Sequence, residues 1–161
     1  MNKHLSWDDF RGKPEPRNSI ASTHYDLIKK CYLKEDFATV QIVAVFFPSE
    51  SWKRKKKDGV LIHEQKHFDI VELFARKLRK KIQEGSYTNY NDLIKKLEDL
   101  YRYDQKELDH YQNQYDRATN YSRNVRRQRK WNKRISDELN DLSNYKDNTF
   151  IVNFQPKVSS Y

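Results

Sequence analysis

The first third of the chain contains apolar segments of the composition that is typical of β-strands. Residues 40–47 form a run of β-branched and aromatic side chains that ends at Pro48, which is typical of a strand. Residues 23–33 predict a second, weaker strand of mixed polarity, and Glu35-Asp36 predicts the turn between the two strands. Residues 148–154 predict one more short strand near the end of the chain.

Three later segments follow the helical period instead. We predict helices over about residues 60–83, about residues 91–119, and from residue 124 to about residue 142. Gly85 supplies a stop after the first helix, and the second helix carries one apolar stripe that Asp104 interrupts. Residues 1–20 contain Pro14 and Pro16 and predict an irregular lead-in. The expected fold is therefore α+β, dominated by helices, with a small N-terminal β-sheet.

Composition narrows the class of protein without identifying a function. A chain of 161 residues suits one domain, and a net charge of +9 favours acidic partners. Cys31 is the single cysteine, which excludes an intramolecular disulfide and a cysteine-based zinc site. No stretch approaches the roughly 18 apolar residues that span a bilayer. Residues 1–10 lack the apolar core of a signal peptide, so for an exported protein we expect a signal already removed and Met1 added.

The chemistry is concentrated in the first predicted helix, where residues 63–67 form an HExxH motif. On a helix, His63 and His67 lie only about 40° apart, so both imidazoles can reach a common ion. This spacing recurs in zinc hydrolases. Glu64 flanks the ion within reach of a water molecule and is the expected general base. We therefore predict that His63 and His67 bind Zn²⁺.

The environment of the histidine pair argues against a chance match. The pair continues the apolar stripe of its helix, which includes Ile70, Phe74 and Leu78. Two buried imidazoles without a hydrogen bond or a metal ion would be costly. Asp69 and Glu72 face away from the expected ion, so the third ligand should come from the second helix, the third helix or the loop between them.

Several segments together resemble a known family. They are residues 5–14 (LSWDDFRGKP), Ser51-Trp52, residues 63–70 (HEQKHFDI), Ala75-Arg76, Tyr115-Asp116, Thr119, Gln128 and Trp131. This set resembles domain-of-unknown-function family 922, a bacterial family regarded as zinc-dependent proteases. The resemblance implies a single zincin-like metalloprotease domain over residues 1–161, a peptide or protein as substrate, and a periplasmic or extracellular location.

One segment departs from the family pattern. Ala118, Tyr121 and Ser122 stand where the family usually has Glu, His and Gly. If that His is the third zinc ligand in the family, this chain offers the phenol of Tyr121 instead, because a metal ion can stabilise a phenolate. The other candidates for the third ligand are His110, Asp104 and His24.

Two alternative functions remain at this point. A degenerate zincin that serves as a binding protein is suggested by the altered residues 118–122. A nucleic-acid-binding domain is suggested by the basic residues in segments 123–131 and 53–57. We favour solvated, basic surfaces for both segments, so nucleic acid is not the expected partner.

Overall fold

The computed structural model describes residues 3–155 and has an α+β fold in that range. Its helices are α1 (Asp58–Gln83), α2 (Tyr90–Thr119) and α3 (Val125–Asp141), with short 3-10 helices η1 (Trp7–Asp9) and η2 (Ser143–Tyr145). Its strands are β1 (Ala21–Ser22), β2 (Tyr25–Leu33), β3 (Phe37–Phe46), β4 (Trp52–Lys53) and β5 (Thr149–Asn153). The α+β part of the predicted fold class is confirmed.

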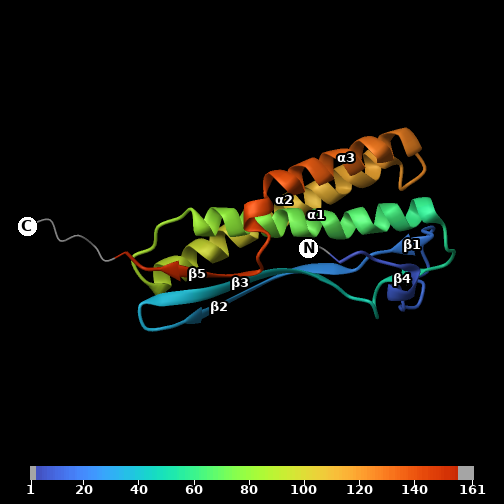
Figure 1. Cartoon of the computed structure of the whole chain (residues 1–161). Helices are drawn as coiled ribbons and strands as arrows, with labels where there is room; N and C mark the ends of the chain where they lie inside the picture. The colour runs from blue at the N-terminus through green and yellow to red at the C-terminus, as the bar shows by residue number, and fades with distance from the viewer. Residues whose placement is uncertain (1–2, 156–161) are drawn as a thin grey trace, which may run out of the picture.

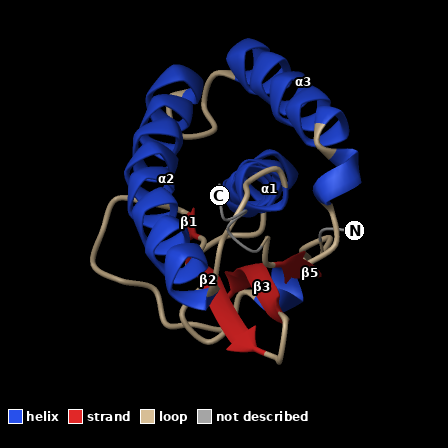
Figure 2. Ribbon diagram, turned by 90° about the vertical axis from the view of Figure 1, so that its left-hand side faces the viewer, coloured by secondary structure: helices blue, strands red, loops and turns tan. Residues whose placement is uncertain are grey.

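Helix α1 lies at the centre of the molecule. The view along its axis in Figure 2 shows α2, α3 and the sheet arranged around it. Figure 1 shows α2 and α3 running beside α1, with the strands on the other side of it. The core residues of α1 accordingly face several directions, and Val71, Leu73, Ala75 and Leu78 are all fully buried. Every other large element is positioned by packing on α1.

The three helices begin and end within a few residues of the bounds that the sequence predicts. Asn89 caps α2, because its side chain accepts a hydrogen bond from the backbone N–H of Asp92. Asn124 caps α3 in the same way, with the N–H of Arg127 as the donor. None of the helices within residues 3–155 combines the length and the apolar character needed to cross a bilayer.

The strands form two antiparallel sheets, and each of them differs in one respect from the expectation. Strands β2, β3 and β5 form a three-stranded sheet with β3 in the middle, and β1 pairs with β4. The larger sheet is therefore not purely N-terminal, because β5 joins it from beyond α3. The pairing of β1 with β4 was missed because two residues in each strand are too few to show a period.

The lead-in is irregular as predicted, apart from η1, but it is also part of the core. Leu5, Trp7 and Phe10 are buried in a second apolar cluster with Val60 and Phe68 of α1. Close docking requires Gly12, because a Cβ there would lie 2.9 Å from the backbone of residues 49–51.

Lys53 corrects the expectation that the whole basic run 53–57 is a solvated loop. It lies in β4, and its Nζ donates hydrogen bonds to the carbonyl oxygens of Trp7 and Phe10. The remaining residues of the run, 54–57, are exposed as expected.

A buried ionic cluster joins α1 to the sheet and to the end of α3. Arg79 is 0% exposed and forms a two-pronged hydrogen bond to the carboxylate of Glu72, with N–O distances of 3.0 and 3.2 Å. The same guanidinium donates to the carbonyl oxygen of Ile42 in β3 and to the Asn148 side chain. Arg76 also pairs with Glu72, with an N–O distance of 2.8 Å. Such charges are tolerated inside the protein because their hydrogen-bonding groups are paired.

We expect substitution of Arg79 by alanine to lower the free energy of unfolding by about 3–5 kcal/mol, because it strips a buried carboxylate and a backbone carbonyl of their donor. Urea denaturation followed by circular dichroism measures this loss. Arg102→Ala is the control, since Arg102 pairs with Asp99 at an exposed position. A loss below about 1 kcal/mol for Arg79→Ala would show that the cluster is not a major source of stability.

Candidate metal centre

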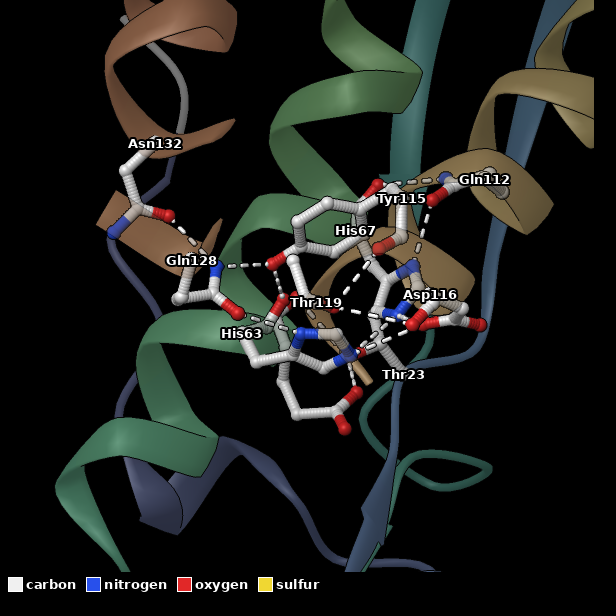
Figure 3. Close-up of polar contacts among 10 residues, drawn as sticks. Thr23, His63, His67, Gln112, Tyr115, Asp116, Thr119, Gln128 and Asn132 are labelled. Carbon is white, nitrogen blue, oxygen red and sulfur yellow. Dashed lines mark hydrogen bonds and ion pairs between the residues drawn. The ribbon is translucent and has the colours of Figure 1, made fainter. Parts of the chain in front are cut away.

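Three potential ligand atoms converge near the start of α1. His63 Nε2 and His67 Nε2 lie 3.1 Å apart. Asp116 Oδ1, from the last turns of α2, lies 3.1 Å from the first nitrogen and 3.0 Å from the second (Figure 3). We call these three atoms the ligand triangle. They form the single group of His, Cys, Asp or Glu side chains within residues 3–155 that is arranged to hold a metal ion.

The outer nitrogen of each imidazole, Nδ1, is the one that is not part of the ligand triangle, and each forms a hydrogen bond with a glutamine side chain. His67 Nδ1 lies 2.6 Å from Gln112 Oε1, and His63 Nδ1 lies 3.0 Å from Gln128 Oε1. The amide nitrogen of Gln112 donates to the His67 carbonyl oxygen, so the amide oxygen is left to face the ring. An amide oxygen only accepts, and each Nδ1 must therefore carry the proton. This leaves each Nε2 able to offer a lone pair to a cation.

Gln128 is oriented in turn by Tyr115 and Asn132. Its amide nitrogen donates to the Tyr115 hydroxyl at 2.6 Å and to Asn132 Oδ1 at 2.8 Å (Figure 3). The Tyr115 ring stacks on His63 with a centroid distance of 4.7 Å, and its hydroxyl donates to the His63 carbonyl oxygen. Burial raises the pKa of Tyr115, so the phenol stays protonated and keeps this donor.

The pKa values of Asp116 and His67 show that the triangle favours a positive charge among its three atoms. Burial by itself would raise the pKa of Asp116, but hydrogen bonds from His63 and His67 outweigh it and lower that pKa. Burial alone would lower the pKa of His67, yet Asp116 and Glu64 raise it. A proton and a metal ion therefore compete for the same position between one carboxylate and two imidazoles.

The size of the triangle fits a small divalent cation. Two ligand atoms of a tetrahedral zinc site lie about 3.3–3.6 Å apart, given metal–ligand distances of roughly 2.0–2.2 Å. The three edges of 3.0–3.1 Å are slightly shorter, so modest outward shifts would accommodate the ion. With only three protein ligands, a fourth position would stay open, as in catalytic zinc sites.

The triangle opens into a pocket of about 710 Å³. Residues 17–23 form one wall of it, α1 and α2 form others, and the turn between α2 and α3 contributes residues 121–123. Glu64 lies in this wall, only 5% exposed, and its carboxylate accepts a hydrogen bond from the Thr23 hydroxyl at 2.7 Å. The predicted base and the candidate ligands therefore share one pocket.

The structure brings Asp116, which is not among the sequence-based candidates for the third ligand, close to the histidine pair. Asp116 lies against both imidazoles, whereas the Tyr121 side chain is 60% exposed where the turn borders the pocket. Ligation by Tyr121 therefore stays a prediction, and the geometry favours Asp116. Asp116 lies on the second helix, one of the three sources that the sequence predicts for the third ligand.

The remaining candidates lie outside the triangle. His110 bonds to Gln114 on the outside of α2, Asp104 pairs with Lys81, and His24 faces Glu15 and Glu50. Asp69 and Glu72 are not part of the group either, as the helical phase predicts. Asp69 contacts Gln65 and Lys66, and Glu72 belongs to the Arg79 cluster.

The segment that departs from the family pattern forms an unusual turn. Asn120, Tyr121 and Ser122 have φ values of 49°, 52° and 71°, three successive left-handed residues without a glycine. This conformation gives a physical reason for a glycine at the position of Ser122 in the family pattern. The Tyr121 N–H donates to the Asp116 carbonyl oxygen at 2.9 Å, so the turn anchors the end of α2 at the site.

Sequence reasoning missed the roles of Asp116, Gln112 and Gln128. One signal was available: Gln112 and Asp116 are spaced four apart beside the apolar stripe of α2, so they share a helix face. That face could be assigned to the metal site only once the crossing of α2 over α1 was known.

Comparison with known families gives a match over the part of the chain that contains the ligand triangle. Residues 48–123 match the model of the family described as bacterial protein of unknown function, DUF922. The resemblance inferred from the sequence is confirmed, and all three atoms of the ligand triangle lie in the matched range. Searches of curated proteins and of solved structures return no significant match. The zincin-like character of the fold therefore stays a prediction.

Two single substitutions distinguish Asp116 from Tyr121 as the third ligand. We expect Asp116→Ala to weaken zinc binding by ~100-fold or more. Even the loss of a residue that contacts a ligand, and not the metal itself, lowers metal affinity by about 10–100-fold. Tyr121→Phe should leave the affinity within a factor of about two. Competition titration with a chromogenic chelator measures both affinities. The reverse pattern would restore Tyr121 as the ligand and remove Asp116.

Proposed function

We propose that this protein is a zinc-dependent metallopeptidase with a site formed by His63, His67, Asp116 and Glu64. The observation that carries the proposal is the ligand triangle, open on one side to a pocket whose wall contains a buried carboxylate. Two imidazoles and one carboxylate also suit ferrous iron. The adjacent Glu64 favours a hydrolytic zinc site, because hydrolysis needs a base beside the open position.

The chemistry divides between the ion and the chain. Zinc, when bound, would supply Lewis acidity, polarising a substrate carbonyl and lowering the pKa of a water molecule. The chain holds the ligands in place through Gln112, Gln128 and Tyr115, which limits their motion. Glu64 would take the proton from the attacking water and pass it to the leaving amine.

A peptide as the substrate is supported by the backbone of β1 on the side that does not pair with β4. The Arg54 N–H donates to the Ile20 carbonyl oxygen, and Ser22 pairs with Trp52. Hydrogen-bonded and non-hydrogen-bonded pairs alternate in an antiparallel ladder, so Ala21 directs its backbone polar groups away from β4. This segment lines the pocket. An extended peptide could therefore add along it by backbone hydrogen bonds and present a carbonyl to the site.

The main alternative is a degenerate zincin that binds metal or peptide without catalysis. The residues Ala118, Tyr121 and Ser122 favour this alternative, because they are close to the site in sequence and differ from the family pattern. We also propose an exported protein, periplasmic or extracellular, with a peptide or protein partner rather than nucleic acid. These proposals rest on the family resemblance.

Catalysis is tested by Glu64→Gln in the zinc-loaded protein. We expect cleavage of a mixed peptide library, followed by mass spectrometry, to fall by about 10²–10⁴-fold, because the amide cannot accept the proton. Zinc stoichiometry should stay the same, since Glu64 is not a ligand. Glu98→Gln, at an exposed position on α2, serves as the control.

Equal cleavage by wild type and Glu64→Gln would exclude Glu64 as the base. A zinc-loaded wild-type protein that cleaves no peptide would favour the non-catalytic alternative.

A further inference from the structure

Thr23 is the first of the two residues between β1 and β2, and its side chain reaches Glu64 from the opposite wall of the pocket. Its hydroxyl oxygen lies 2.7 Å from Glu64 Oε2 and 3.2 Å from the Glu64 carbonyl oxygen. A hydroxyl carries one proton, and the shorter distance and the carboxylate charge favour donation to Oε2. Thr23 is drawn beside the two imidazoles in Figure 3.

This contact restrains the Glu64 carboxylate. Within residues 3–155, the Thr23 hydroxyl is its one hydrogen-bond partner, although the side chain is almost fully buried. The bond occupies Oε2 and leaves Oε1 available for a water molecule. A glutamate has three rotatable side-chain bonds, so a fixed partner at one oxygen largely determines where the other oxygen points.

The position of Thr23 is itself fixed on both sides. The preceding residues are held by the pairing of β1 with β4. The next residue, His24, donates its N–H to the buried Ser51 hydroxyl at 2.9 Å, and its carbonyl oxygen accepts from the Phe47 N–H. The hydroxyl is therefore presented from a rigid segment, as precise positioning requires.

Thr23 also adjoins the edge proposed to bind the peptide. Ala21, whose backbone groups point away from β4, lies two residues earlier in the same extended segment. One stretch of backbone would thus align the substrate and also hold the Glu64 carboxylate through the Thr23 hydroxyl.

We propose that Thr23 is a positioning residue that aligns Glu64 with a peptide bound along β1. This inference rests on the proposed peptidase function. Thr23→Val keeps the shape of the side chain and removes the hydroxyl. We expect kcat to fall about 10–100-fold, because small misplacements of a catalytic group have effects of this size. KM and zinc affinity should change by less than about twofold, since the backbone edge and the ligand triangle are untouched.

Two further variants separate positioning from general damage to the fold. Thr23→Ser restores the hydroxyl and should recover most of kcat. Thr39→Val makes the same chemical change on β3, at a half-buried position away from the pocket, and should behave as wild type. Wild-type kcat in Thr23→Val, or a Thr23→Ser variant as slow as Thr23→Val, would overturn the proposal.

A crystal structure of Thr23→Val gives a result that does not need turnover. We expect the Glu64 carboxylate to leave its present position while His63, His67 and Asp116 keep theirs. An unmoved carboxylate would overturn the role of Thr23. Failure of the peptidase function is distinguishable, because it would appear as absent cleavage by the zinc-loaded wild-type protein.

Discussion

Three electron-rich atoms are held within 3.1 Å of one another in this protein, and the arrangement can be stable only if positive charge lies among them. Protons can supply that charge, which explains the raised pKa of His67 and the lowered pKa of Asp116. A divalent cation would supply it more completely, because it interacts with all three atoms at once. The surrounding hydrogen bonds suit both states, because they hold protons on the Nδ1 atoms and leave both Nε2 atoms facing Asp116.

The rest of the fold brings these atoms together and keeps one side of them accessible. Helix α1 is enclosed by α2, α3 and the sheet along most of its length, and the Arg79 cluster ties its later turns to β3. The first turns carry His63, Glu64 and His67, and here the enclosure is completed by residues 17–23 rather than by the large sheet. The reactive groups therefore lie on packed secondary-structure elements and face a polar pocket. Sites built on such elements are positioned more precisely than sites on loops.

Local rules predicted much of this arrangement. The periods of apolar residues located all three helices and the three longer strands, and the helical phase of α1 correctly turned His63 inward and Asp69 and Glu72 away from the site. The third ligand candidate could not be found in this way. Its position depends on how α2 crosses α1, a tertiary relation that no single-helix pattern contains, and Asp116 looks like an ordinary helix-end carboxylate in sequence. The β1–β4 pair and the buried lead-in were missed because they are too short or too irregular to show a period.

The most direct test is a crystal structure of the protein after purification without chelator and soaking with one equivalent of zinc, with the metal identified by anomalous scattering. We expect one zinc ion within about 2.0–2.2 Å of His63 Nε2, His67 Nε2 and Asp116 Oδ1, with its remaining position facing the pocket. Zinc held without Asp116, or an empty ligand triangle under these conditions, would contradict a metal centre built from these three residues.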